Sequence, residues 1–152
     1  MKSKTASYLS ATAALATLGI GLACAPAFAG ADDIVGTWLT GDGDGWVDIT
    51  LQGAEISGVI AGTPNDDPER SKVDDKNPDP ALQQRELLGL ELFSGFHFDG
   101  EDRWVDGRIY DPNSGKTYKC VITIVDADTL KVRGFIGIVL LGRTEIWQRK
   151  RE

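Results

Sequence analysis

The segment that decides the fold is residues 103–136, "RWVDGRIYDPNSGKTYKCVITIVDADTLKVRGFI". Three runs rich in Val, Ile, Thr and aromatic residues are separated by two short turn sequences, "DPNSG" at 111–115 and "DAD" at 126–128. In the first run Val105 and Ile109 stand opposite polar residues, as in a strand with one buried face. Because links of this length join neighbouring antiparallel strands, the segment predicts a meander of strands 103–110, 116–124 and 129–136.

The same pattern extends over most of the chain. Glycines, 18 in all, separate further β-forming runs, and turn sequences such as "GDGDG" at 41–45 connect them. Antiparallel strands joined by short links close most economically into a barrel, because closure removes the exposed edges. We therefore predict an all-β fold, an eight-stranded antiparallel up-and-down barrel with one long loop and a short helix; an open two-sheet sandwich is the alternative. The five additional strands are predicted at 34–40, 46–52, 55–63, 90–98 and 142–149.

Residues 1–29 have the three parts of a secretory signal peptide: lysines near the start, an apolar run and an Ala-Phe-Ala cleavage site. We expect cleavage after Ala29, which leaves residues 30–152 as one exported domain. The alternative, lipid attachment at Cys24, is disfavoured by the residues that precede this cysteine. The apolar run is too short for a transmembrane helix, and no later segment is long and apolar enough.

Charge and cysteine content exclude several classes of function. The chain has 16 basic and 23 acidic residues, a net charge of −7, and the leader contributes lysines but no acid. An acidic exported domain is a poor candidate for binding nucleic acid or anionic lipid surfaces. Cleavage also removes Cys24 and leaves Cys120 without an intramolecular disulfide partner, so we expect Cys120 to be a small buried hydrophobic residue.

Residues 64–88 interrupt the strand pattern. Proline cannot donate to a strand ladder, so residues 64–80 are predicted to form a loop. The sequence "PALQQRELLG" then predicts one or two helical turns, with Pro80 at the first helical position and Gly89 beyond the end. A long loop with a short helix is typical of a lid or binding loop, and a plug over the barrel end is equally consistent.

The loop at residues 74–86 invites comparison with calcium sites. Four oxygen-bearing side chains stand at positions 1, 3, 5 and 12 of a twelve-residue window: Asp75, Asn77, Asp79 and Glu86. Pro80 occupies the sixth position, where an EF-hand loop needs glycine, and this disfavours an EF-hand. Looser divalent-metal binding by Asp74, Asp75 and Asp79 stays as a weaker hypothesis.

Catalytic patterns are absent from the sequence. His97 is the single histidine, which excludes a zinc site built on several imidazoles. The sequence contains no nucleophile elbow, phosphate loop or dinucleotide fingerprint. We therefore expect neither an enzyme nor a bound cofactor.

A structural cluster is predicted where the first and last strands meet. Gly36 and Trp38 lie on the first strand, and Arg143 and Arg149 bracket Trp147 on the last. These strands are neighbours in a closed barrel, so an arginine can cover a tryptophan ring, a contact worth roughly 0.5–2 kcal/mol. We expect this cluster to close one end of the barrel.

Four segments together resemble one protein family. They are "IVGTWLT" at 34–40, "DDKNPDPALQQRELLGLELFSGF" at 74–96, "DGRIYDPNSGKTY" at 106–118 and "LKVRGFIGIVLLGRTEIWQR" at 130–149. In these segments the chain resembles the domain-of-unknown-function 2147 family of exported bacterial proteins. The resemblance implies a calycin-type, lipocalin-like barrel in the bacterial envelope, periplasmic or extracellular, and no established activity.

The predicted function is the binding of a small, largely apolar ligand in the barrel mouth. The apolar strand residues expected to line or pack the interior are Leu90, Leu92, Phe96, Val105, Ile109, Ile122, Leu130 and Val132. The loop residues expected to hold the loop or meet the ligand's polar end are Asp75, Asn77, Asp79 and Arg85. The alternative function is an envelope interaction or structural module with a filled barrel and an unidentified protein partner.

Overall fold

The computed structural model describes residues 29–64 and 71–151. The predicted signal peptide up to residue 28, including Cys24, lies outside the described residues. Within the described ranges, no helix has the length and apolar character needed to cross a bilayer.

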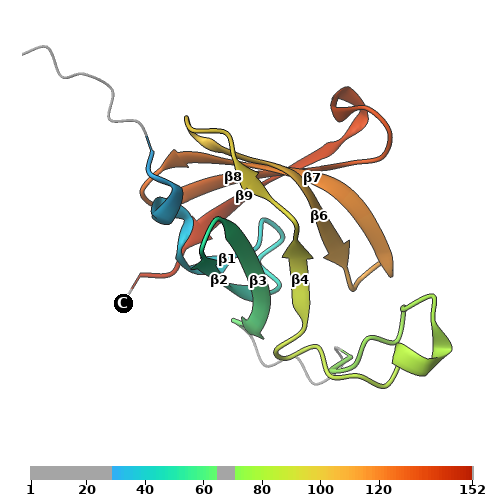
Figure 1. Ribbon diagram of the computed structural model, residues 1–152. Helices are drawn as coiled ribbons and strands as arrows, with labels where there is room; N and C mark the ends of the chain where they lie inside the picture. The colour runs from blue at the N-terminus through green and yellow to red at the C-terminus, as the bar shows by residue number, and fades with distance from the viewer. Residues whose placement is uncertain (1–28, 65–70, 152) are drawn as a thin grey trace, which may run out of the picture.

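The fold is a closed antiparallel barrel (Figure 1). The strands of the described chain are β1 Gly36–Leu39, β2 Trp46–Gln52, β3 Glu55–Gly62, β4 Glu91–Ser94, β5 His97–Phe98, β6 Arg103–Asp111, β7 Lys116–Asp126, β8 Thr129–Phe135 and β9 Arg143–Arg149. They follow the order β4-β3-β2-β1-β9-β8-β7-β6-β5, and β4 also pairs with β6 to close the sheet on itself. β4 and β5 both pair with β6 and are two halves of one broken strand, so the nine labelled strands form an eight-stranded barrel. The predicted barrel is confirmed, and the alternative of an open two-sheet sandwich is wrong.

Several element bounds differ from the sequence-based expectation. The predicted strand 90–98 is divided between β4 and β5 at Gly95, which adopts φ +73°, a value that favours glycine. The predicted strand 34–40 begins only at Gly36, because Ala31–Ile34 forms a short 3-10 helix, η1. The helix predicted from Pro80 is limited to the 3-10 turn η2, Pro80–Leu82. A third 3-10 turn, η3 (Val139–Leu141), lies between β8 and β9.

A β-bulge in β6 changes the face on which its residues lie. The register shifts between Trp104 and Gly107, and Asp106 within the bulge adopts φ 64°. Trp104 and Gly107 are both buried on the inner face of β6. Val105 lies on the other face of the strand and does not belong to the buried cluster. The expected placement of Val105 in the interior is therefore corrected, because regular alternation does not continue through a bulge.

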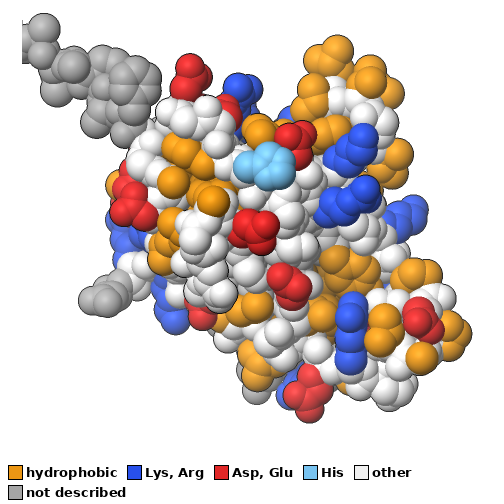
Figure 2. All heavy atoms as spheres, in the orientation of Figure 1, with side chains coloured by type: hydrophobic (Ala, Val, Ile, Leu, Met, Phe, Trp, Pro, Cys, Tyr) orange, Lys and Arg blue, Asp and Glu red, His pale blue; other side chains and the backbone are white. Residues whose placement is uncertain are grey.

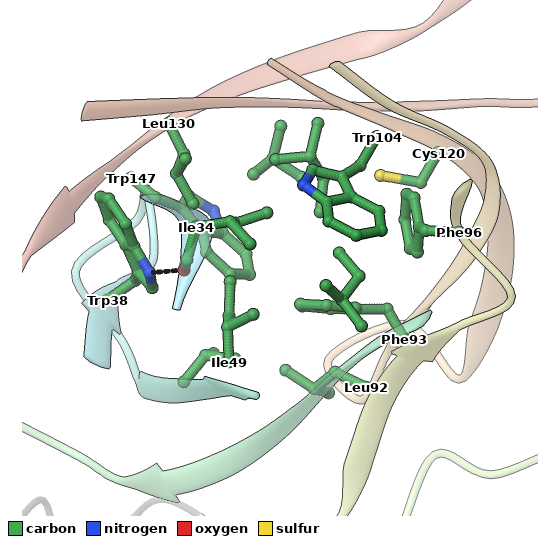
Figure 3. Packing of buried hydrophobic residues seen from close by; sticks show 14 of the residues in the cluster. Ile34, Trp38, Ile49, Leu92, Phe93, Phe96, Trp104, Cys120, Leu130 and Trp147 are labelled. Atoms are coloured by element: carbon green, nitrogen blue, oxygen red, sulfur yellow. Dashed lines mark hydrogen bonds between the residues drawn. The ribbon is translucent and has the colours of Figure 1, made fainter. Parts of the chain in front are cut away.

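The core fills the part of the barrel away from the long loop. Its largest fully buried side chains are Trp38, Trp104, Phe93 and Phe96. Figure 3 shows Phe93, Phe96 and Trp104 on one side of the buried cluster and Trp38 on the other, where its indole donates to the Ile34 carbonyl at 2.9 Å. Phe93 and Phe96 pack edge to face with their ring centroids 5.5 Å apart. This half of the barrel is a packed core.

Barrel closure near η1 depends on Arg149. Its guanidinium lies over the Trp38 ring, 4.1 Å from the centroid, and donates to the carbonyls of Val35 and Asp33. A Cβ at Gly36 would lie 2.5 Å from the same guanidinium, so glycine leaves the space that Arg149 occupies. Arg143 takes no part in this cluster. It lies near the start of β9, at the opposite end of the barrel, so its predicted role in closure is corrected.

Candidate ligand-binding site at the barrel mouth

The two ends of the barrel are built differently. The end that we call the mouth carries the connections β1–β2, β3–β4, β6–β7 and β8–β9, whereas the other end carries η1 and short turns. A cavity of about 500 Å³ opens among the first three of these connections and the adjoining strand ends. This volume falls within the range of about 300–1,000 Å³ that small-molecule sites occupy.

The walls of the cavity are largely apolar. Its floor is formed by Val47, Leu92 and Trp147, which are buried and also belong to the core cluster. Ile60 on β3 and Ile109 on β6, the two strands that flank β4, pack against that cluster and extend the apolar wall toward the mouth. An apolar ligand in this position would therefore rest directly on the packed half of the barrel.

The rim of the cavity is polar and mostly acidic. The acidic residues Asp42, Asp44, Glu86 and Glu145 line it, together with Lys72. Glu145 accepts a hydrogen bond from the indole N–H of Trp147 at 3.3 Å, which links the rim to the floor. The site therefore combines an apolar interior with hydrogen-bonding groups at its entrance.

A buried carboxylate fixes the long loop against the barrel. Asp74 is 1% exposed and accepts hydrogen bonds from the Tyr110 hydroxyl at 2.5 Å and from Asn77 Nδ2 at 2.7 Å. Arg85 donates to it through Nε and its terminal nitrogen, both at 2.8 Å, and its guanidinium lies 5.6 Å from the Tyr110 ring centroid. Tyr110 is on β6, so this network joins both arms of the loop to the barrel wall.

The ionisation of this network follows from its contacts. Burial alone would raise the pKa of Asp74, but hydrogen bonds from Tyr110, Asn77 and Arg85 together hold that pKa below its ordinary value. The pKa of the Tyr110 hydroxyl is raised by burial and by its hydrogen bond to the Asp74 carboxylate. At neutral pH the centre of the network is therefore a carboxylate that accepts from a neutral phenol and a guanidinium.

Backbone contacts complete the anchoring of the loop. Val73 and Glu86 form an isolated antiparallel bridge, and the Leu87 amide donates to the Lys72 carbonyl at 2.9 Å. The β6–β7 turn packs directly beneath, because a Cβ at Gly115 would lie only 1.9 Å from the carbonyl oxygen of Lys76. The loop wall of the cavity is thus held in place without a bound ligand.

The predicted loop residues divide between support and exposure. Asn77 is buried: its side-chain oxygen accepts from the Asp79 amide at 2.9 Å. Asp79 caps η2 by accepting from the Ala81 amide at 3.0 Å, and Arg85 supports Asp74. Asp75 is exposed and pairs with Lys76 at 3.3 Å. None of the four lines the cavity, so their contacts hold the loop instead of facing a ligand.

The acids proposed for metal binding are not brought together. Both oxygens of Asp74 are used within its network, and Asp79 is used as a cap. Among residues 29–64 and 71–151, the acidic groups close enough to share an ion are instead Asp99, Glu101 and Asp102, outside this loop. The geometry does not favour a metal site at residues 74–86.

The predicted strand residues also divide into two groups. Leu92 and Ile109 line the cavity, whereas Phe96 and Ile122 lie in the packed core. Leu90 is half-buried beside the loop, where its carbonyl accepts from the Ile60 amide at 2.9 Å. Leu130 and Val132 are core residues as well.

Sequence reasoning missed Asp74 as a support and Tyr110, Trp46 and Ile60 as lining residues. The last three share one property, since each lies at the mouth end of its strand. That position could have been read from the predicted meander, because alternate connections of a meander lie at the same end. The burial of Asp74 depends on a partner 36 residues away and has no local signal.

Comparisons with known proteins agree with this architecture. Residues 36–149 match the family described as "Uncharacterized protein conserved in bacteria (DUF2147)". No curated protein matches the chain. Among solved structures, protein HP1028 from the human pathogen Helicobacter pylori, which belongs to the lipocalin family, superposes with a TM-score of 0.69. It is 20% identical, and the match covers 78% of this chain and 83% of that one, a similarity of fold.

Proposed function

We propose that this chain, which belongs to the DUF2147 family of uncharacterized bacterial proteins, binds one small, largely apolar ligand in the cavity at its mouth. The observation that carries the proposal is the cavity of about 500 Å³ above the packed core, with an apolar floor and a polar rim. An eight-stranded barrel is wide enough to hold one small ligand, and lipocalin-like barrels use this space for that purpose. A structural module with a filled barrel has no need of such a cavity.

The prepared state of the cavity wall supports the proposal. The Asp74 network and the contact between Lys72 and Leu87 hold the loop in its place on the rim. A site that is formed before the ligand arrives avoids the entropic cost of ordering a loop on binding. The polar loop residues therefore act as supports for the apolar wall.

The shape of the site indicates how a ligand would lie. An apolar body would contact Leu92, Ile109 and Trp147, and a polar end would remain near Glu145 and Lys72 at the rim. The predicted signal peptide supports binding outside the cytoplasm, in the periplasm or beyond. Catalysis is not part of the proposal.

Titration with an uncharged apolar fluorophore, N-phenyl-1-naphthylamine, tests the proposed site. Ile109→Trp places a large ring in the cavity, whereas Val125→Trp adds the same ring on the exposed surface near the opposite end. We expect Ile109→Trp to weaken fluorophore binding at least about tenfold, because the ring removes the apolar space that the ligand needs. Val125→Trp should bind as the wild type does, and equal binding by the Ile109→Trp variant would refute the proposal.

A further inference from the structure

The β8–β9 connection carries exposed apolar side chains that the cavity does not explain. We call residues 135–142, "FIGIVLLG", the apolar tip. Its large aliphatic residues are 42–80% exposed: Ile136, Ile138, Val139, Leu140 and Leu141. Single exposed aliphatic residues are ordinary, but a contiguous group marks an interaction site. Figure 2 shows hydrophobic side chains gathered on the projection that corresponds to this connection in Figure 1.

The apolar tip has a defined backbone. Arg133 donates from Nε to the Val139 carbonyl at 2.8 Å and from a terminal nitrogen to the Leu140 carbonyl at 3.2 Å. Within η3, the Leu141 amide donates to the Ile138 carbonyl at 3.1 Å. Backbone groups that are already hydrogen-bonded can enter an apolar medium without the cost of losing water. The carbonyls of Ile138, Val139 and Leu140 therefore already have partners within the protein.

The charge around the tip differs from that of the whole chain. Residues 133–144, "RGFIGIVLLGRT", contain Arg133 and Arg143 and no acidic residue, although the chain has a net charge of −7. The Arg143 side chain is 80% exposed and lies 3.6 Å from a Glu145 carboxylate oxygen. The exposed Lys119 lies opposite Phe135 in the β7–β8 ladder. The aliphatic side chains of the tip are suited to the acyl chains of a bilayer, and the basic residues beside the tip are suited to anionic headgroups.

The composition of the tip favours lipid over a protein partner. Energetically dominant residues of protein interfaces are most often Trp, Tyr and Arg, with Leu and Val under-represented. The exposed side chains of the tip are instead Ile, Val and Leu, and the Arg133 guanidinium is directed back onto the tip's own carbonyls. The surface thus lacks the groups that give protein interfaces their specificity.

The tip and the cavity lie at the same end of the barrel. The β8–β9 connection and the long loop both follow strands that end at the mouth (Figure 1). Leu88, on the cavity rim, is itself 64% exposed. Contact of the tip with a membrane would therefore bring the cavity entrance close to the lipid.

We infer that the apolar tip docks this protein on the surface of a lipid bilayer by inserting its aliphatic side chains between the headgroups. The barrel stays outside the membrane with its mouth at the interface. The charge-based expectation against anionic lipid surfaces describes the chain as a whole, and the acid-free tip is a local exception. Passage of an apolar ligand between bilayer and cavity would follow, a consequence that rests on the proposed function, whereas docking itself does not.

Vesicle flotation tests the docking. The probe is a vesicle of phosphatidylethanolamine and phosphatidylglycerol in a 3:1 ratio, with pure phosphatidylcholine vesicles for comparison. The protein is purified from the cells that produce it, so that any processing of the N-terminus has taken place. We expect the wild type to float and the double variant Leu140→Asp, Leu141→Asp to lose at least about tenfold in partitioning. The double variant Leu140→Ser, Leu141→Ser adds no charge and should also partition more weakly onto the vesicles than the wild type.

The matched control is Val35→Asp with Val125→Asp, which removes two exposed aliphatic residues near the opposite end of the barrel. Its partitioning onto the vesicles should lie within about twofold of the wild-type value if the tip is the site of contact. Failure of the wild type to bind either vesicle, or equal losses in control and tip variants, would overturn the inference. So would a wild-type dimer that the tip variants convert to monomer without vesicle binding, because a second copy would then cover the tip.

Failure of docking and failure of the cavity function are distinguishable. The tip variants should bind N-phenyl-1-naphthylamine in solution as the wild type does, because Leu140 and Leu141 do not line the cavity. A chain that floats normally but binds no fluorophore would overturn the cavity function and leave the docking intact.

Discussion

Asp74 illustrates how a single side chain positions the mouth of this barrel. It is buried, it carries a charge, and its partners come from the loop and from β6. A buried carboxylate with this many donors stabilises only when all of its partners are present, since each of them is left unsatisfied if the charge is removed. Its contribution is therefore to the placement of the loop more than to the core.

The substitution Asp74→Asn keeps the shape of the side chain but removes its charge. We expect it to lower the free energy of unfolding by about 2 kcal/mol, because hydrogen bonds to a charged group contribute more than neutral ones. Urea denaturation at pH 7 measures this difference. The control Asp75→Asn alters an exposed neighbour and should change stability by less than about 0.5 kcal/mol. Equal effects of the two substitutions would show that the Asp74 network does not hold the loop.

The lowered pKa of Asp74 makes part of the stability dependent on pH. A carboxyl whose pKa is depressed on folding stabilises the protein above its unfolded value of 3.8. This contribution is lost as the pH falls below that value, through the folded pKa. The difference in unfolding free energy between wild type and Asp74→Asn should therefore shrink as acid is added below pH 3.8. Urea denaturation across the acid range measures it, and a constant difference would contradict the assignment.

Close packing against glycine shapes the strands of the core. A Cβ at Gly107 would lie 2.3 Å from atoms of the Phe96 ring, and one at Gly58 would lie 2.2 Å from the Phe93 ring. The aromatic rings thus rest directly on the backbone of β6 and β3. Phe96 occupies the break between β4 and β5, so the broken strand and the glycine beneath it form one packing unit.

The substitution Gly107→Ala tests this unit. The added methyl group meets a buried ring in a packed core, and overpacking of this kind costs about 1–3 kcal/mol. Gly134→Ala is the control, since a Cβ at that strand position meets nothing closer than 3.5 Å. Thermal or urea denaturation should show a clear loss for Gly107→Ala and a change of less than about 0.5 kcal/mol for Gly134→Ala. The same stability for both variants would contradict the close approach of Phe96.

Strand periodicity and turn chemistry were sufficient to predict the barrel, its strand order and the position of the long loop. The β6 bulge, the break at Gly95 and the short η2 were not predicted, because each depends on packing against residues distant in the sequence. At the site, Leu92 and Ile109 could be identified from alternation. The division between core and cavity could not, because it depends on how far side chains such as Phe93 and Trp104 fill the interior.

The whole molecule combines a packed core with a cavity and an apolar tip at the same end of the barrel. The core closes one end around Trp38 and Arg149, and the long loop shapes the other. The apolar tip extends from the same mouth end as the cavity. The proposed ligand site and the inferred docking surface therefore lie at the same end of the barrel.

Native mass spectrometry of the protein purified from the cells that produce it tests ligand binding most directly. The account predicts a population whose mass exceeds that of the chain by one small molecule. It also predicts that this population is lost in Ile109→Trp and retained in Val125→Trp. A wild type with the mass of the chain alone, or an added mass that persists in Ile109→Trp, would contradict it.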